Sequence, residues 1–292
     1  MKQVAFLTLM LFGGAIGALV HPFFGIVPYY VLSIVRPQSL WDYALPEDVR
    51  WSLIAAGVAT FGAIMHGSRL FLKARWNPVA ILMVIFAGLV LLSCISARDV
   101  NIATDRGIEY FKIFFMAILT TLVISRLTHL RWLTWVILAC ISYVAWEFNA
   151  RYLFDSRVDI LFEGHGGLDN NDTGVMLAMG LPLCYFWWRA RPNLWTALSA
   201  GFAALVMTHA LMLSYSRSGM VSAVAGLLWL AFHHRPRRHH LVIAPLAIIA
   251  VCYMAGPEIR AEFLSIGTYK EDTTAQMRLQ SWTRGWDTAW DH

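Results

Sequence analysis

The sequence predicts an all-α, polytopic integral membrane protein. Its 292 residues are 58% hydrophobic and only 14% charged, and the mean hydropathy is +0.57. Soluble domains are typically about 45–50% apolar and about 25% charged, so both a soluble fold and an intrinsically disordered chain are excluded. The cysteines lie scattered in apolar runs without paired spacing, which indicates neither a disulfide framework nor a zinc site. They are Cys94, Cys140, Cys184 and Cys252.

Ten apolar runs approach the roughly 20 residues that a membrane-spanning helix needs. The first follows Lys2 and also fits a signal peptide, but the runs after it favour a membrane helix. The second contains Pro28 and is the shortest, so it fits a re-entrant or tilted segment, or one broken helix together with the first run. The predicted spans are residues 4–20, 23–35, 51–65, 78–96, 108–124, 132–148, 174–188, 194–213, 218–232 and 241–256.

The charges between these runs predict the topology. Four connections carry arginine or lysine and no acidic residue: 67–77, 125–131, 189–193 and 233–240. The positive-inside rule places them in the cytoplasm. Alternation then places the other connections outside: 36–50, 97–107, 149–173, 213–218 and the chain after 256. Topology therefore accounts for the net charge of +5, and no nucleic-acid partner is expected.

The first candidate site is the polar outer stretch 163–173, which leads directly into an apolar run. A structural interpretation is a loop in which Asp172 or Thr173 caps the following helix. That interpretation leaves the three glycines and the Asp/Asn cluster unexplained. Glycine lets backbone approach a ligand, and a helix N-terminus offers N–H groups to an anion. Substrate-binding candidates are therefore Asp169, Asn170 and Asn171.

The second candidate is Arg217, in the very short outer turn Ser214-Tyr215-Ser216-Arg217-Ser218-Gly219. An arginine here could simply extend its side chain to the membrane interface. A guanidinium held at the membrane surface among serines is also well suited to grip phosphate through two parallel hydrogen bonds. The residue types alone leave both interpretations open.

The third candidate is the segment 257–292. Leu279, Trp282, Trp286 and Trp290 recur at helical spacing and predict an interfacial helix that anchors in membrane lipids. Arg278 and Arg284 accompany this stripe as candidates for phosphate contact.

Other polar residues give weaker signals. Glu109 and Lys112 are spaced to pair on one helix face near the outer boundary. Histidines lie at both ends of the basic loop 233–240, and this pattern indicates a solvated segment rather than a metal site. They are His233, His234, His239 and His240.

Three segments in chain order resemble the O-antigen ligase superfamily. They are GLDNNDTGVMLAMGLPL, SYSRSGMVSAVAGLLWL and IGTYKEDTTAQMRLQSWTRGWDTAWDH. Together with YYVLSIVRPQSLWDYAL, they are most similar to the O-glycosylation ligases associated with exosortase A systems. The likeness extends over essentially the whole chain, and its specificity lies in the ordered set rather than in any single motif.

The resemblance implies a GT-C-like glycosyltransferase of the bacterial inner membrane. It would take a glycan from undecaprenyl diphosphate on the periplasmic face and transfer it to a hydroxyl of protein or lipid A. The transfer would be inverting, with no metal or other cofactor. By motif position, Arg217 (S-R-S-G, where the family usually has S-R-G-G) and Arg278 (R-L-Q-S-W) match the family's phosphate-contacting arginines. They are the expected catalytic residues, because they would stabilise the departing diphosphate.

The sequence departs from the family at its end. Members of the family continue through a large periplasmic loop that carries a required histidine, and then into further membrane helices. The context of His292 does not match that histidine. The chain is therefore expected to be the N-terminal part of a ligase, with a transmembrane domain at 1–256 and the start of the loop at 257–292.

Three alternatives remain open at this level. A polymerase of the same superfamily would use the same donor but a lipid-linked glycan as acceptor. A transporter or flippase would need a polar path across the membrane, and the predicted spans lack the midplane acidic residues typical of one. A non-catalytic membrane scaffold is the third.

Overall fold

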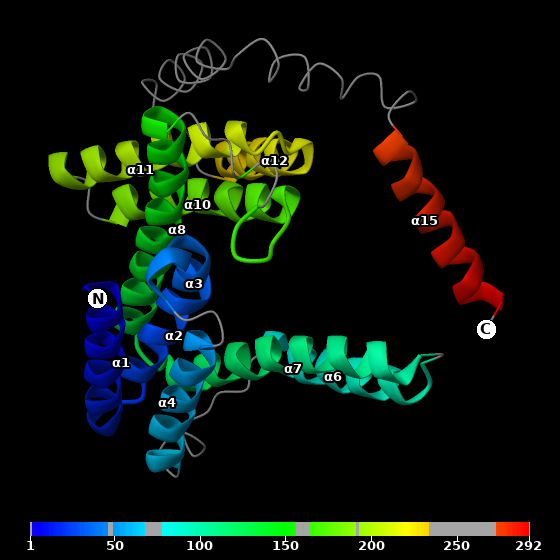
Figure 1. Cartoon of the computed structure of the whole chain (residues 1–292), viewed down its shortest axis with the longest axis horizontal. Helices are drawn as coiled ribbons and strands as arrows, with labels where there is room; N and C mark the ends of the chain where they lie inside the picture. The colour runs from blue at the N-terminus through cyan, green and yellow to red at the C-terminus, as the bar shows by residue number, and fades with distance from the viewer. Residues whose placement is uncertain are drawn as a thin grey trace. The chain divides into compact units, whose positions relative to one another are not determined.

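The computed structural model describes residues 2–45, 49–67, 78–97, 99–155, 160, 164–190, 193–233 and 273–291. These residues are helical or irregular, apart from one antiparallel bridge between His165 and Leu168 (Figure 1). The helices are α1 (Lys2–Val20), α2 (Phe23–Val35), α3 (Pro37–Leu40), the 3-10 turn η1 (Asp42–Ala44), α4 (Trp51–Met65), α6 (Pro78–Ile95), α7 (Val100–Val123), α8 (Leu127–Asp155), α10 (Asn170–Ala190), α11 (Leu194–Leu213), α12 (Arg217–His233) and α15 (Thr273–Asp291).

Each of the first nine predicted spans falls on one of these helices, and the tenth, 241–256, lies outside the described residues. Among the described residues, four helices are long and apolar enough to cross a membrane: Gln3–Val20, Pro78–Ile95, Leu127–Asp155 and Leu194–Leu213. The helical membrane class is therefore supported, whereas the count of ten spans stays a prediction. Helix α7 shows why a helix can be longer than its apolar run, because it also includes the charged residues Asp105, Arg106 and Glu109.

The chain divides into two compact units, residues 1–140 and 141–292, and α8 contributes to both. In the first unit, α1 and α2 fold back on one another. A Cβ added at Gly14 would lie 2.5 Å from Pro28 Cγ, and one at Gly17 would lie 2.7 Å from Phe24 Cβ. Such glycines let membrane helices approach closely. The first two apolar runs are thus two packed helices and not one broken helix.

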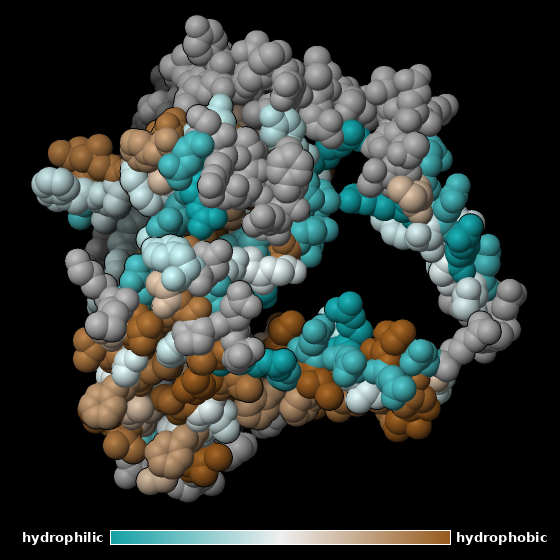
Figure 2. Space-filling view, viewed as in Figure 1, coloured by the Kyte–Doolittle hydropathy of each residue, from teal (hydrophilic) through white to brown (hydrophobic). Residues whose placement is uncertain are grey.

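Helix α4 packs against both α1 and α2. Leu7 near the start of α1 shares a buried cluster with Trp51 at the start of α4, and Gly62 late in α4 meets Ala18 late in α1. Helices α1 and α4 are therefore parallel, with their C-terminal ends together. Their outer surfaces are apolar, as Figure 2 shows, which fits contact with lipid.

Helices α6 and α7 form a second packed pair. Cys94 Sγ lies 3.2 Å from the carbonyl oxygen of Ala103, and a Cβ at Gly107 would lie 2.6 Å from the same sulfur. The predicted partner of Glu109 was wrong. Its carboxylate pairs with Arg106 at 3.1 Å rather than with Lys112. Arg106 and Lys112 each lie three residues from Glu109, so either could share its helix face, and the pair forms with Arg106, one turn toward the N-terminus. The side chains of Arg106 and Glu109 are both exposed.

In the second unit, α10 packs against both α11 and α12 (Figure 1). Gly219 near the start of α12 lies against Gly174 near the start of α10, and Gly226 lies against Pro182 further along. Helices α10 and α12 therefore run in the same direction, and their N-termini lie side by side. Helix α11 connects them and runs in the opposite direction.

Candidate functional site

The candidate site is the shared N-terminal end of α10 and α12. The two backbones meet closely there, since a Cβ added at Gly219 would lie 2.8 Å from the carbonyl carbon of Gly174 and 2.9 Å from its Cα. One added at Gly174 would lie 2.7 Å from Ser216 Cβ. Only glycine fits these contacts without displacing backbone, so the sequence places glycine at both positions.

Asp169 caps α10. Its Oδ1 accepts a hydrogen bond from the backbone N–H of Asp172 at 2.7 Å, and Thr173 Oγ1 donates to the Asp169 carbonyl at 2.7 Å. The expectation that Asp172 or Thr173 is the cap was therefore wrong. Position mattered more than residue type, because a cap must precede the first helical residue, Asn170. Asp169 is exposed and Thr173 is fully buried.

The glycines before this cap form a tight turn. Gly164, Gly166 and Gly167 have φ values of 62°, 59° and 84°, the left-handed region that favours glycine. His165 and Leu168 exchange backbone hydrogen bonds of 3.2 and 3.0 Å across the turn. The glycines therefore have a structural explanation: they form the tight turn that precedes α10.

Two asparagines tie the start of α10 to the turn before α12. Asn170 Nδ2 donates to the Ser214 carbonyl at 3.1 Å. Asn171 Oδ1 accepts from the hydroxyls of Ser216 and Ser218, each at 3.1 Å. Ser214 and Ser216 are fully buried. The structure therefore brings the first two candidate segments into direct contact, and it gives both asparagines a bracing role.

Arg217 is the first residue of α12 and is half-buried. Ser216 caps the helix through Oγ, which accepts from the Gly219 N–H at 3.0 Å, and Tyr215 turns the chain with φ of 51°. Each helix N-terminus carries roughly half a positive charge. Two adjacent N-termini with a guanidinium in the first turn of one make a region suited to a phosphate-bearing group.

A polar pair in the same unit, one member of which is buried, was not identified from the sequence. Asn149 of α8 is buried and donates from Nδ2 to the carbonyls of Ala145 and Val206, at 2.6 and 2.9 Å. Its Oδ1 contacts Nδ1 of His209 in α11, and the Tyr152 ring lies 5.6 Å from the His209 ring. The available signal was weak, because only His209 lies inside a predicted apolar run, 194–213, whereas Asn149 comes directly after the run 132–148.

The predicted aromatic stripe lies on a helix, as expected. Leu279, Trp282, Trp286 and Trp290 fall on α15 with exposed side chains, and the last two rings lie 5.8 Å apart. Arg278 and Arg284 are exposed on the same helix. The structure brings together Asp169, Asn170, Asn171 and Arg217. Arg278 and Arg284 lie on this separate helix, so their role in the site stays a prediction.

Metal ligation has no support in the described part of the chain, where no three His, Cys, Asp or Glu side chains are placed to hold an ion. Of the histidines near the basic loop, His233 ends α12 and stacks on Trp229 at 3.7 Å. The other three, His234, His239 and His240, lie outside the described residues.

Replacement of Asn171 by alanine is expected to lower the free energy of unfolding by about 1–3 kcal/mol, because the buried Ser216 hydroxyl and the partly buried Ser218 hydroxyl lose their acceptor. Chemical denaturation in detergent measures this. Asn101→Ala, at an exposed position in the first turn of α7, is the matched control. In a double-mutant cycle, Asn171→Ala should cost less in a Ser218→Ala background. Additive costs would show that this hydrogen bond does not hold the turn.

Two family models match parts of this chain. Residues 202–292 match the family model described as O-Antigen ligase, a range that includes Arg217, Arg278 and Arg284. This match supports a membrane enzyme of the O-antigen ligase or polymerase type. No curated protein and no solved structure matches the chain significantly. Residues 1–153 match the model described as a family of unknown function, DUF5935, and because this range covers more than half of the 292 residues, the chain belongs to that family.

Proposed function

We propose that this protein is a glycan ligase of the bacterial inner membrane. It transfers a glycan from undecaprenyl diphosphate to a hydroxyl of protein or lipid A on the periplasmic face. The observation that carries the proposal is the paired start of α10 and α12, with Arg217 directly after the buried Ser216. The O-Antigen ligase match over residues 202–292 supports the reaction class.

The chemistry follows from the charge that moves during transfer. When the acceptor hydroxyl attacks the anomeric carbon, it releases its proton to solvent, the bond to the diphosphate breaks and negative charge grows on the leaving phosphate. Two helix N-termini and a guanidinium stabilise that charge without reorganising, because the packing of α10 on α12 already fixes them. The capping network holds Arg217 in the first turn of α12. Such a direct displacement would invert the configuration at the anomeric carbon.

The remaining arginines complete the proposal. Arg278 would supply a second phosphate contact and Arg284 a further contact, from the helix α15. The tryptophans of that helix would hold it at the periplasmic interface, where aromatic side chains are favoured. Similarity to the exosortase-associated subgroup and a GT-C-like architecture belong to the same proposal.

Analysis of glycan products in cells tests the reaction. Deletion of the gene is expected to leave full-length glycan attached to its lipid carrier and absent from the acceptor. Re-expression of the wild-type protein should restore attachment. Single repeat units on the carrier would indicate a polymerase instead, and loss of lipid-linked glycan from the outer face would indicate a transporter. Unchanged attachment would contradict any role in transfer.

A further inference from the structure

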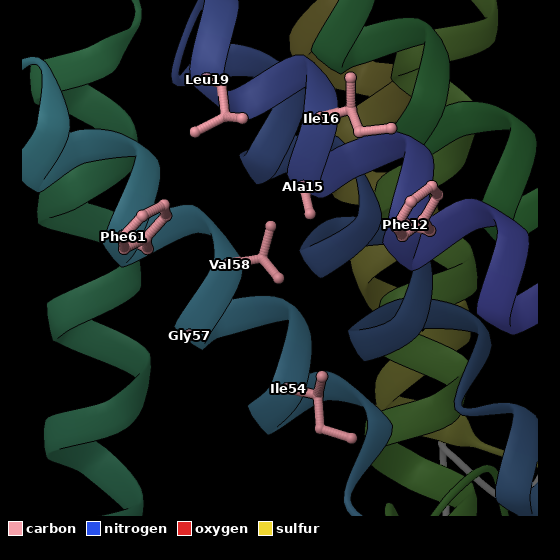
Figure 3. Close-up of a pocket in the computed structure, with 8 residues that line it drawn as sticks. All are labelled: Phe12, Ala15, Ile16, Leu19, Ile54, Gly57, Val58 and Phe61. Atoms are coloured by element: carbon pink, nitrogen blue, oxygen red, sulfur yellow. The ribbon is translucent and has the colours of Figure 1, made fainter.

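An open apolar groove runs between α1 and α4 in the first unit. Its volume is about 530 Å³, within the range of small-molecule sites. Figure 3 shows the side chains that line it, with α1 on one side and α4 on the other. All of them are apolar: Phe12, Ala15, Ile16, Leu19, Ile54, Gly57, Val58 and Phe61. Gly57 opens the groove further, since a Cβ there would meet nothing within 4 Å.

A cluster of basic residues lies at one end of this groove. Because α1 and α4 are parallel, the groove runs toward the C-terminal ends of both helices. His21 comes two residues after Leu19, and His66 is the C-cap residue that directly follows α4. The ring of His129, in the first turn of α8, lies 4.7 Å from the His21 ring. Arg126 immediately precedes α8 and is exposed.

These groups influence one another electrostatically. Burial lowers the pKa of His21, and the positive fields of His129, His66 and Arg126 lower it further. The Nδ1 of His21 accepts a hydrogen bond from the Phe23 N–H at 3.2 Å, so Nε2 carries its proton. The end of the groove therefore combines a hydrogen-bond donor with the permanent charge of Arg126. The predicted topology places this end on the cytoplasmic side.

We propose that the α1–α4 groove and the basic cluster of His21, His66, His129 and Arg126 form one binding site for an anionic phospholipid. An acyl chain lies in the groove, and the phosphate headgroup lies against the cluster. Charge complementarity favours this occupant. A purely apolar groove in lipid selects no headgroup, whereas basic pockets at the cytoplasmic ends of membrane helices attract anionic ones. This site is separate from the α10–α12 end and independent of the proposed transfer reaction.

Lipid binding to the purified full chain in detergent, followed by native mass spectrometry, tests the headgroup half of the site. Phosphatidylglycerol is compared with phosphatidylcholine of identical acyl chains. Wild-type protein should prefer the anionic lipid, and Arg126→Gln should lower that preference by about fivefold, the contribution expected of one cation near a membrane surface. The double variant His21→Gln/Arg126→Gln should lose it. Arg131→Gln, exposed five residues further along α8, should leave it unchanged.

The acyl half is tested by filling the groove. Gly57→Leu should weaken binding of both lipids several-fold, whereas Gly88→Leu on α6, where a Cβ also meets nothing, should not. Equal affinity of the wild type for both lipids would overturn the proposal. So would tight binding of glycerol 3-phosphate, which would indicate a phosphate site without a lipid chain. If the double variant does not fold, the headgroup preference of the single variant Arg126→Gln, at an exposed position, tests the proposal on its own.

Discussion

Replacement of Arg217 by alanine is expected to slow glycan transfer at least about 100-fold while the amount of protein stays unchanged. Loss of one fixed donor to a developing oxyanion typically costs about 10²–10³ in rate. Arg217 begins α12 beside the start of α10 and is only half-buried, so its removal should spare the fold. The measurement is glycan attachment to the acceptor in cells that lack the native gene, normalised to protein level.

Two further variants sharpen this test. Arg217→Lys should retain partial transfer, because lysine keeps the charge but cannot form two parallel hydrogen bonds with phosphate. Arg189→Ala, in the last turn of α10 at the opposite end of the helix pair, should transfer normally. Full activity of Arg217→Ala would remove this arginine from the mechanism. An equal loss in Arg189→Ala would point to a general effect of charge on membrane insertion.

Replacement of Gly219 by alanine is expected to destabilise the protein by about 1–3 kcal/mol or more, the usual cost of overpacking. The new Cβ would lie 2.7 Å from Leu211 Cδ1, and a rotamer change could relieve that contact. It would also lie 2.8 Å from the backbone of Gly174, which cannot move without separating α10 from α12. Thermal unfolding in detergent and the yield of monodisperse protein measure the effect.

Gly201→Ala is the matched control for this change. Gly201 lies within α11, and a Cβ there would meet nothing within 4 Å. Alanine should therefore stabilise the helix by up to about 1 kcal/mol. Opposite signs for the two glycines are the expected outcome. Equal stability of both variants would show that α10 and α12 do not approach as closely as described.

The sequence predicted most helices because a membrane span is a long apolar run, but several helices extend beyond the predicted spans. Helix α7 begins at Val100, eight residues before the predicted span at 108, since Asp99 caps it by accepting from the N–H groups of Asn101 and Ile102. Helix α8 continues past 148 to Asp155. Hydropathy falls where a helix leaves the membrane, whereas the backbone remains helical until its hydrogen bonds end.

The candidate site was only partly predictable for a different reason. Residue types indicated both polar segments, but nothing in the sequence shows that Asn171 and Ser216, 45 residues apart, share a hydrogen bond. The close approach of Gly174 and Gly219 is likewise a property of packing. The Asn149–His209 contact was missed because Asn149 falls just past the end of the predicted span 132–148, and His209 taken alone is an ordinary polar interruption of the run 194–213.

Binding of the donor's diphosphate tests the central claim most directly. A short-chain isoprenyl diphosphate is titrated into the purified protein in detergent, alongside the matching isoprenol. The paired helix N-termini and Arg217 predict a clear preference for the diphosphate, and at least about a tenfold loss of affinity in Arg217→Ala, since charged hydrogen bonds contribute about 1.5–3 kcal/mol. Equal binding of diphosphate and isoprenol, or equal affinity in wild type and Arg217→Ala, would contradict the claim.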